Sequence, residues 1–391
     1  MIEYGLLFLL LPVAAFSGWL AGRRGGARHV GQKVSRLSTN YFRGLNYLLN
    51  EQPDKAIEVF LEIAEVDKRT VETHFALGHL FRRRGEVDRA IRLHQSLVAR
   101  STLSNEQRTQ AILELGEDYM RAGLLDRAET LFGDLASVED AAPQALKHLI
   151  AIYQQERDWA KAIHYAERLQ ALTGKPMGKV IAQFHCEIAE QQKQKGEIEA
   201  ARSSLERAYH SELNCVRACL IEGQIEIQLG NDLAAIRVLE RAARHDPEML
   251  PELLPPMLAA YQRKEESARA RAFLSEMLER HAGASPLLAL VQFIEREEGR
   301  AAAIEYLTRQ LRRRPSIRGQ GALIELSLAE HEVPVERELL QVLKQLSEQL
   351  IAGVPAYRCG RCGFGARSHH WQCPSCKSWS SVKPIHGVAG E

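Results

Sequence analysis

The sequence predicts an all-α chain of repeated helical hairpins, preceded by a membrane-spanning helix and followed by a small metal-binding module. Three observations predict this organisation: an uncharged apolar run near the amino terminus, small and aromatic residues that recur at a regular interval, and paired cysteines near the carboxyl terminus. With 391 residues the chain is long enough for several domains. Its formal net charge of +1 at pH 7 argues against broad nucleic-acid binding, so no nucleic-acid partner is expected.

Residues 1–22 are predicted to form a transmembrane anchor. After Glu3 this segment carries no charged side chain, and as a helix the run spans about 28 Å, close to the hydrocarbon thickness of a bilayer. Arg23 and Arg24 follow directly, so the positive-inside rule places the amino terminus outside the cytoplasm and the rest of the chain inside. A cleaved signal peptide is the alternative, but its basic amino-terminal region is missing. Residues 23–38 are expected to be a basic juxtamembrane linker.

Residues 39–315 are predicted to be a repeat array, because small and aromatic residues recur at intervals of about 34 residues. Gly44 recurs as Gly78, and Ala56 recurs as Ala90. In each unit a small residue lets two helices approach closely, and a large side chain fills the groove that remains. This is the tetratricopeptide signature, and about eight units are predicted. The units are marked by Gly44 and Phe60, Gly78 and Ala90, Gly116 and Phe132, Tyr153 and Ala166, Ala189 and Leu205, Gly223 and Leu239, Tyr261 and Leu274, and Ala303 and Leu307.

Residues 316–354 keep a helical pattern of apolar residues and are predicted to form a helical cap and hinge before the metal module. Stacked hairpins carry no reaction centre of their own, and the sequence holds no nucleophile elbow, phosphate-binding loop, zincin motif or dinucleotide fingerprint. A protein that is not an enzyme is therefore expected. His185, His210 and His245 are isolated on helical segments and are expected to be ordinary core or surface histidines.

Residues 355–391 are predicted to form a rubredoxin-like four-cysteine metal module. Cys359 and Cys362 make one C-x-x-C pair, and Cys373 and Cys376 make a second. Two such knuckles supply the four thiolates that tetrahedral zinc needs at distances of about 2.3 Å. Structural zinc is predicted, with an iron electron-transfer centre and a pair of disulfides as the alternatives. A segment of about 35 residues is too small to be stable by apolar burial alone, so the metal should hold it together.

The two knuckles differ in one position. Gly363 follows the first pair, where the backbone must turn sharply, whereas Lys377 stands at the corresponding place after the second pair. His369, His370 and Trp371 lie between the pairs, and we expect them to pack on a neighbouring surface rather than to bind the metal.

Three further cysteines, Cys186, Cys215 and Cys219, bring the total to an odd seven. An odd number suits a reducing compartment better than a framework of disulfides. Cys215 and Cys219 lie four residues apart on one predicted helix face, but buried apolar cysteines are the expected role for these residues.

Several segments resemble the lipopolysaccharide assembly protein B family of Gram-negative bacteria, and the resemblance covers essentially the whole chain. They are LLFLLLPVAAF followed by GRR, RRGEVDRAI from Arg83 to Ile91, and the tail segments YRCGRCGF, WQCPSCKSWS and VKPI. The resemblance implies an adaptor in the bacterial inner membrane, single-pass, with a periplasmic amino terminus and a cytoplasmic body. It implies that the adaptor promotes degradation of the lipid A deacetylase LpxC by the FtsH protease, under restraint from an inner-membrane sensor of lipopolysaccharide.

The resemblance also implies that the four cysteines of the tail are metal ligands and that other lipopolysaccharide assembly proteins are partners. Two alternative functions remain open from the sequence. One is a scaffold for lipopolysaccharide synthesis or export enzymes without a proteolytic role, and the other is an iron-loaded redox or sensor protein. Self-association is left open as well.

Overall fold

The structure is a computed structural model that describes residues 16, 17, 19, 40–50, 52–66, 71–281, 283–329, 334–388 and 390–391. The predicted membrane anchor and juxtamembrane linker lie almost entirely outside these residues. Where the structure describes the chain, it contains no helix that is both long and apolar enough to cross a membrane. The described residues up to Arg157 form one compact unit, and those from Asp158 onward form a second.

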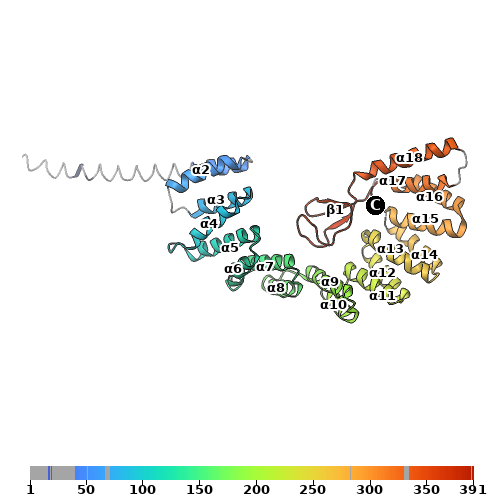
Figure 1. The fold of residues 1–391 in the computed structure, drawn as a ribbon, viewed down its shortest axis with the longest axis horizontal. Helices are drawn as coiled ribbons and strands as arrows, with labels where there is room; N and C mark the ends of the chain where they lie inside the picture. Colours follow the sequence, from blue (N-terminus) through green and yellow to red (C-terminus); the bar gives the residue numbers. More distant parts are fainter. Residues whose placement is uncertain are drawn as a thin grey trace, which may run out of the picture. The chain divides into compact units, whose positions relative to one another are not determined.

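The first unit is built from successive helices that pack on their neighbours in the chain, such as α3 on α4 and α5 on α6. A capping box starts α5, because the Ser104 hydroxyl accepts from the backbone N–H of Gln107 and the Gln107 side chain accepts from the backbone N–H of Ser104. The helices are residues 40–49, α2 (Pro53–Val66), α3 (Val71–Arg84), α4 (Val87–Val98), α5 (Asn105–Arg121), α6 (Leu125–Leu135) and α7 (Ala142–Glu156) (Figure 1).

The second unit continues the helical repeat and ends in three short strands. One continuous apolar cluster runs through it from Cys219 on α11 to Leu326 on α17. The helices are α8 (Trp159–Thr173), α9 (Gly178–Gln194), α10 (Ile198–Ser211), α11 (Val216–Gln228), α12 (Asp232–His245), the 3-10 helix η1 (Pro247–Met249), α13 (Leu250–Arg263), α14 (Ser267–Arg280), α15 (Ala284–Glu298), α16 (Arg300–Arg313), α17 (Ile317–Leu328) and α18 (Pro334–Ala352).

Close approach of paired helices explains the small residues of the repeat. A Cβ atom added at Gly116 on α5 would lie 2.5 Å from Cζ of Phe132 on α6, closer than real Cβ contacts come. The partner sits at the same offset along the chain in each of four pairs, so the predicted helical repeat is confirmed at the level of packing. The pairs are Gly44 with Phe60, Gly78 with His94, Gly116 with Phe132, and Gly223 with Leu239.

The turns between paired helices need one residue in the left-handed conformation. Gly85 and Gly123 supply it with φ angles of 82° and 76°. In the turn between α13 and α14 the same place is taken by Glu265, with φ of 56°. A side chain in this conformation costs roughly 1–2 kcal/mol relative to the right-handed form, so Glu265 is a locally unfavourable choice.

A charged network joins α3 and α5 in the first unit. Arg82 contacts Glu114 at 2.6 Å and Asp118 at 2.8 Å, and His79 contacts Glu114 at 2.7 Å. Burial alone would raise the pKa of Glu114, but the hydrogen bonds from His79 and Arg82 outweigh it and lower the pKa to about 2. Glu114 is therefore held as a carboxylate through these two partners.

The carboxyl-terminal strands form a small antiparallel sheet within the second unit. Strands β1 (Tyr357–Cys359), β2 (Gly365–Ala366) and β3 (Val382–Pro384) are ordered β2-β1-β3. Tyr357 on the central strand lies opposite Ala366 on one side and Pro384 on the other. A mostly helical repeat protein with a carboxyl-terminal ribbon is thus confirmed as the fold.

Candidate metal centre

The two C-x-x-C segments form matching backbone knuckles. The N–H of Gly363 donates to the carbonyl of Cys359 at 2.9 Å, and the N–H of Lys377 donates to the carbonyl of Cys373, also at 2.9 Å. Gly363 has φ of 77° and Lys377 has φ of 57°. The second knuckle therefore adopts the same left-handed turn without a glycine, and Lys377 makes the turn despite its side chain.

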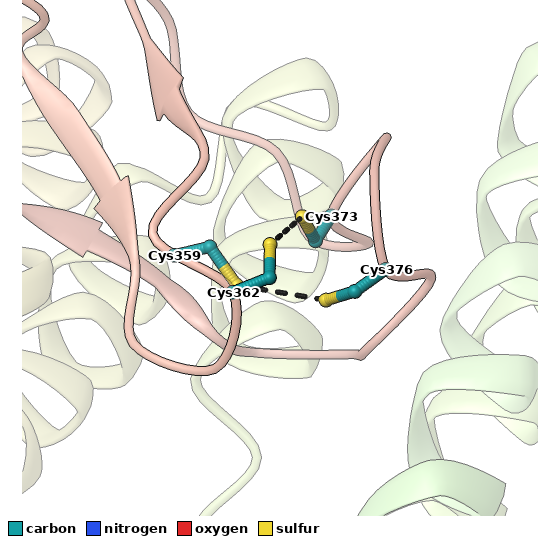
Figure 2. Close-up of side chains that lie close together, drawn as sticks. All are labelled: Cys359, Cys362, Cys373 and Cys376. Atoms are coloured by element: carbon teal, nitrogen blue, oxygen red, sulfur yellow. Dashed lines mark hydrogen bonds between the residues drawn. The ribbon is translucent and has the colours of Figure 1, made fainter. Parts of the chain in front are cut away.

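The four cysteine sulfurs converge on one point, as Figure 2 shows. Sγ of Cys359 lies 3.7 Å from Sγ of Cys376, and Sγ of Cys362 lies 3.7 Å from Sγ of Cys373. All four sulfurs are within 4.8 Å of one another. A tetrahedron with metal–sulfur distances of about 2.3 Å places its sulfurs about 3.8 Å apart, so the donor set fits zinc and iron alike. No disulfide links these four residues.

Local contacts prepare some of the thiols for ionisation. The Ser381 hydroxyl lies 3.3 Å from Sγ of Cys359 and lowers the pKa of this thiol to about 6. The Ser378 side chain lowers the pKa of Cys376, whereas burial raises the pKa of Cys373 to about 11. Since metals bind thiolates, binding at this site should release protons, including the proton of the Cys373 thiol that burial keeps neutral.

Aromatic side chains fasten the ribbon to the repeats of the second unit. Trp379 makes edge-to-face contacts with Trp159 on α8 and Phe184 on α9, with ring centroids 6.2 and 5.9 Å apart. The Arg217 guanidinium on α11 lies 5.7 Å from the ring centre of Trp371 and 5.9 Å from that of Trp379. Trp371 also packs against the apolar cluster of the repeats. The prediction that Trp371 packs on a neighbouring surface is confirmed.

Polar contacts fix the ribbon to other helices of the second unit. The Tyr357 hydroxyl donates to Glu252 on α13 at 2.6 Å, and burial with this contact raises the pKa of Tyr357. Nζ of Lys383 lies 2.5 Å from Asp246, next to η1. The Glu391 carboxylate accepts from the backbone N–H at the start of α15 at 2.7 Å. The ribbon is therefore held from several helices at once.

The histidines considered from the sequence lie outside the group of four converging cysteines. The His369 ring contacts the rings of Tyr357 and Trp371, with centroids 5.7 and 4.5 Å away. His185 is buried, which lowers its pKa, whereas His210 and His245 are exposed. These are ordinary core and surface positions, as the sequence predicted.

The docking residues were not identified from the sequence. Trp379 and Arg217 are the main examples, because neither belongs to a metal motif or to the repeat pattern. One signal was available for the tryptophan: a module of about 35 residues has no core large enough to bury that side chain, so it must find a surface elsewhere. Nothing in the local sequence indicated that Arg217 would be its partner.

The fold and the site together define a class: tetratricopeptide-repeat proteins with a rubredoxin-type metal ribbon at the carboxyl terminus. A family profile described as a rubredoxin metal binding domain matches residues 357–384, and tetratricopeptide repeat profiles match residues 73–108 and 187–249. A solved structure of MamA is 19% identical, with a TM-score of 0.35, over 46% of this chain and 92% of that chain.

Two curated relatives identify the family more narrowly. Lipopolysaccharide assembly protein B of Escherichia coli (strain K12) is 42% identical, over 98% of this chain and 99% of that protein. The Haemophilus influenzae protein of the same name is 33% identical, over 98% of both chains. The chain belongs to the lipopolysaccharide assembly protein B family.

Proposed function

We propose that this protein is an adaptor of the bacterial inner membrane that limits lipopolysaccharide synthesis by promoting FtsH-dependent degradation of LpxC. The observation that carries the proposal is the relation to lipopolysaccharide assembly protein B along nearly the full length of both chains. A solenoid of helical hairpins supports it, because such folds offer long surfaces for binding other proteins. The role is one of binding rather than catalysis.

The metal in this proposal is zinc, held by Cys359, Cys362, Cys373 and Cys376. Its contribution is structural: it joins the two knuckles of a module whose own buried core is small. Because the ribbon contacts α8, α9, α11 and α13 together, a folded ribbon also braces the spacing of these helices. We infer that the ribbon sets the shape of the repeat surface that meets a partner.

The proposed anchor is residues 1–22, which lie almost entirely outside the described residues. An apolar run with arginines after it supports a single span with a periplasmic amino terminus and a cytoplasmic body. Tethering would confine the adaptor to the surface where a membrane protease acts and so raise its effective concentration there. An inner-membrane sensor of lipopolysaccharide would restrain the adaptor, and other assembly proteins would share its surface.

The test is the half-life of LpxC in cells with and without this protein, each with and without FtsH. Faster decay that needs both proteins is the expected result. Stable LpxC with altered assembly of synthesis or export complexes would favour a scaffold without proteolysis. A purified protein that carries iron and absorbs visible light would favour a redox or sensor role.

Two variants connect the test to the structure. Cys362→Ser removes one metal ligand and should lengthen the half-life of LpxC, whereas Cys219→Ser, at a buried thiol outside the ribbon, should not. Deleting residues 1–22 should leave a folded protein that no longer controls LpxC. Full control by the deletion variant would contradict the proposed tether.

A further inference from the structure

Two buried thiols of the repeats face each other at a helix terminus. Sγ of Cys186 on α9 lies 3.8 Å from Sγ of Cys215, the residue that precedes α11. Sequence spacing had placed Cys215 beside Cys219, but the structure brings it to Cys186 instead. A disulfide has an S–S distance of about 2.05 Å, so the two sulfurs need to approach by less than about 2 Å.

The two thiols have different surroundings. Cys215 is the N-cap of α11, and its sulfur accepts from the amide of Gln183 at 3.7 Å. The hydrogen bond with Cys186, together with the backbone N–H groups of Ala218 and Arg217, lowers the pKa of Cys215. The pKa of Cys186 is raised by its hydrogen bond with Cys215 and by burial. Helix N-termini and nearby arginines are features of reactive cysteines, whereas Cys186 has the environment of a neutral thiol.

The two thiols also differ in access. Cys215 lines a cavity of about 340 Å³. Gln183, Arg217, Trp371 and Trp379 contribute to the same walls, so the cavity lies where the ribbon meets the repeats. Cys186 is fully buried and does not line this cavity. A small oxidant that enters the cavity would meet Cys215 first, with Cys186 behind it.

We propose that Cys215 and Cys186 form a peroxide-sensitive dithiol, in which Cys215 is oxidised and Cys186 resolves it. The Cys215 thiolate attacks one oxygen of a hydroperoxide, the O–O bond breaks, and the leaving alkoxide or hydroxide takes a proton to become an alcohol or water. Cys215 is left as a sulfenic acid. The Cys186 sulfur then attacks the Cys215 sulfur, the S–S bond forms, and the sulfenic oxygen leaves with the Cys186 proton as water. The two thiols are oxidised together by two electrons, and the peroxide is reduced.

This reaction would change the contact between the repeats and the ribbon. Arg217 follows Cys215 in the first turn of α11 and lies over both Trp371 and Trp379. Drawing Cys215 toward α9 displaces that turn, and with it the cation that sits on the two tryptophans. The disulfide therefore changes how the metal ribbon packs on the repeats. This inference does not depend on the proposed adaptor role.

The test uses the detergent-solubilised, zinc-loaded full chain. It is treated with hydrogen peroxide, alkylated, and digested with trypsin without reduction. Tryptic cleavage separates the three repeat cysteines, because Cys186 falls in peptide 180–193, Cys215 in 208–217 and Cys219 in 218–237. A linked pair of the first two peptides is expected in the wild type and in the control Cys219→Ser. Peroxide that leaves both peptides alkylated as free thiols, or links Cys215 to Cys219, would overturn the proposal.

Single variants assign the two roles. In Cys186→Ser, dimedone should trap a sulfenic acid on peptide 208–217, while Cys215→Ser should give no adduct on peptide 180–193. The reverse labelling would overturn the assignment. Zinc content and circular dichroism, measured on each variant before oxidation, separate loss of the dithiol from loss of the fold. Oxidation should also change tryptophan emission in the wild type and Cys219→Ser but not in Cys215→Ser, and unchanged emission would refute the link to the ribbon.

Discussion

Gly116→Ala and Gly133→Ala are the same chemical change in one helical hairpin, and Gly116→Ala is expected to be the less stable of the two. A Cβ at position 116 would lie 2.5 Å from Cζ and 2.7 Å from Cε1 of Phe132, whereas a Cβ at position 133 would meet nothing within 4 Å. Phe132 is fully buried and stacks on His148 with centroids 4.6 Å apart, so the ring has no free space into which to turn.

The magnitude follows from comparing the two variants. Alanine in place of glycine within a helix gains about 1 kcal/mol at both positions, so this term cancels in the comparison. Overpacking a filled core costs about 1–3 kcal/mol and applies only at position 116. Gly116→Ala should therefore be less stable than Gly133→Ala by about 1–3 kcal/mol.

Native-state hydrogen exchange measures this difference locally, which suits a chain of many repeats better than one global melting curve. Amides of α5 and α6 should exchange about 5 to 150 times faster in Gly116→Ala than in Gly133→Ala. Equal exchange in the two variants would refute the idea that close helix approach is what requires glycine.

A later hairpin of the same chain combines an alanine with a smaller partner, which avoids the clash between a Cβ at position 116 and the Phe132 ring. Ala189 on α9 and Leu205 on α10 occupy the places that Gly116 and Phe132 take in the earlier hairpin, and both are buried. Adding Phe132→Leu to Gly116→Ala rebuilds that pair. The loss of stability in the double variant should be smaller, by at least about 0.5 kcal/mol, than the sum of the losses in Gly116→Ala and Phe132→Leu. Strict additivity would show that the two side chains do not compete for the same space.

Three further predictions follow from the same structure. Glu265→Gly should slow exchange in α13 and α14 and stabilise them by about 0.5–1 kcal/mol, because glycine takes the left-handed conformation freely; faster exchange would contradict this. Cys362→Ser should abolish stoichiometric metal in elemental analysis while helical circular dichroism persists, since the helices have their own core; retained metal would refute the ligand assignment. The pKa of Glu114 is lowered to about 2 by His79 and Arg82, so its stabilisation is present above about pH 4.5 and lost as pH falls toward 2. Urea titrations at each pH measure the free energy of unfolding. Between pH 5 and 3 this free energy should fall by about 1–2 kcal/mol less in Glu114→Gln than in the wild type, a figure discounted for solvent screening. Parallel curves of unfolding free energy against pH would show that the network does not hold this charge.

The repeat could be predicted because its cause is local and periodic. A glycine in one helix and a large side chain in the next recur at a fixed offset, so the pattern is visible without knowing any distant contact. The choice of His94 as the partner of Gly78 was not foreseen, since its ring occupies a place that aromatic or aliphatic residues fill elsewhere. Glu265 was not foreseen either, because it adopts a turn that the pattern assigns to glycine.

The metal centre also has one part that the sequence predicts and another that only the folded ribbon shows. Two C-x-x-C pairs identify four ligands from spacing alone, because each knuckle is a few residues long and folds around its own backbone hydrogen bonds. That Lys377 adopts the left-handed turn without glycine is a property of the folded ribbon, whose second knuckle keeps the same N–H to carbonyl contact as the first.

The repeat, the four cysteine ligands and the family could be predicted from the sequence, since each depends on residues that are near one another or that recur at a fixed interval. The position of the ribbon on the repeats and the pairing of the buried thiols became visible only in the folded chain. Trp379 reaches Trp159, and Cys186 reaches Cys215, across separations that no local pattern records. These contacts arise from how whole helices stack, and stacking is set by the summed packing of many side chains.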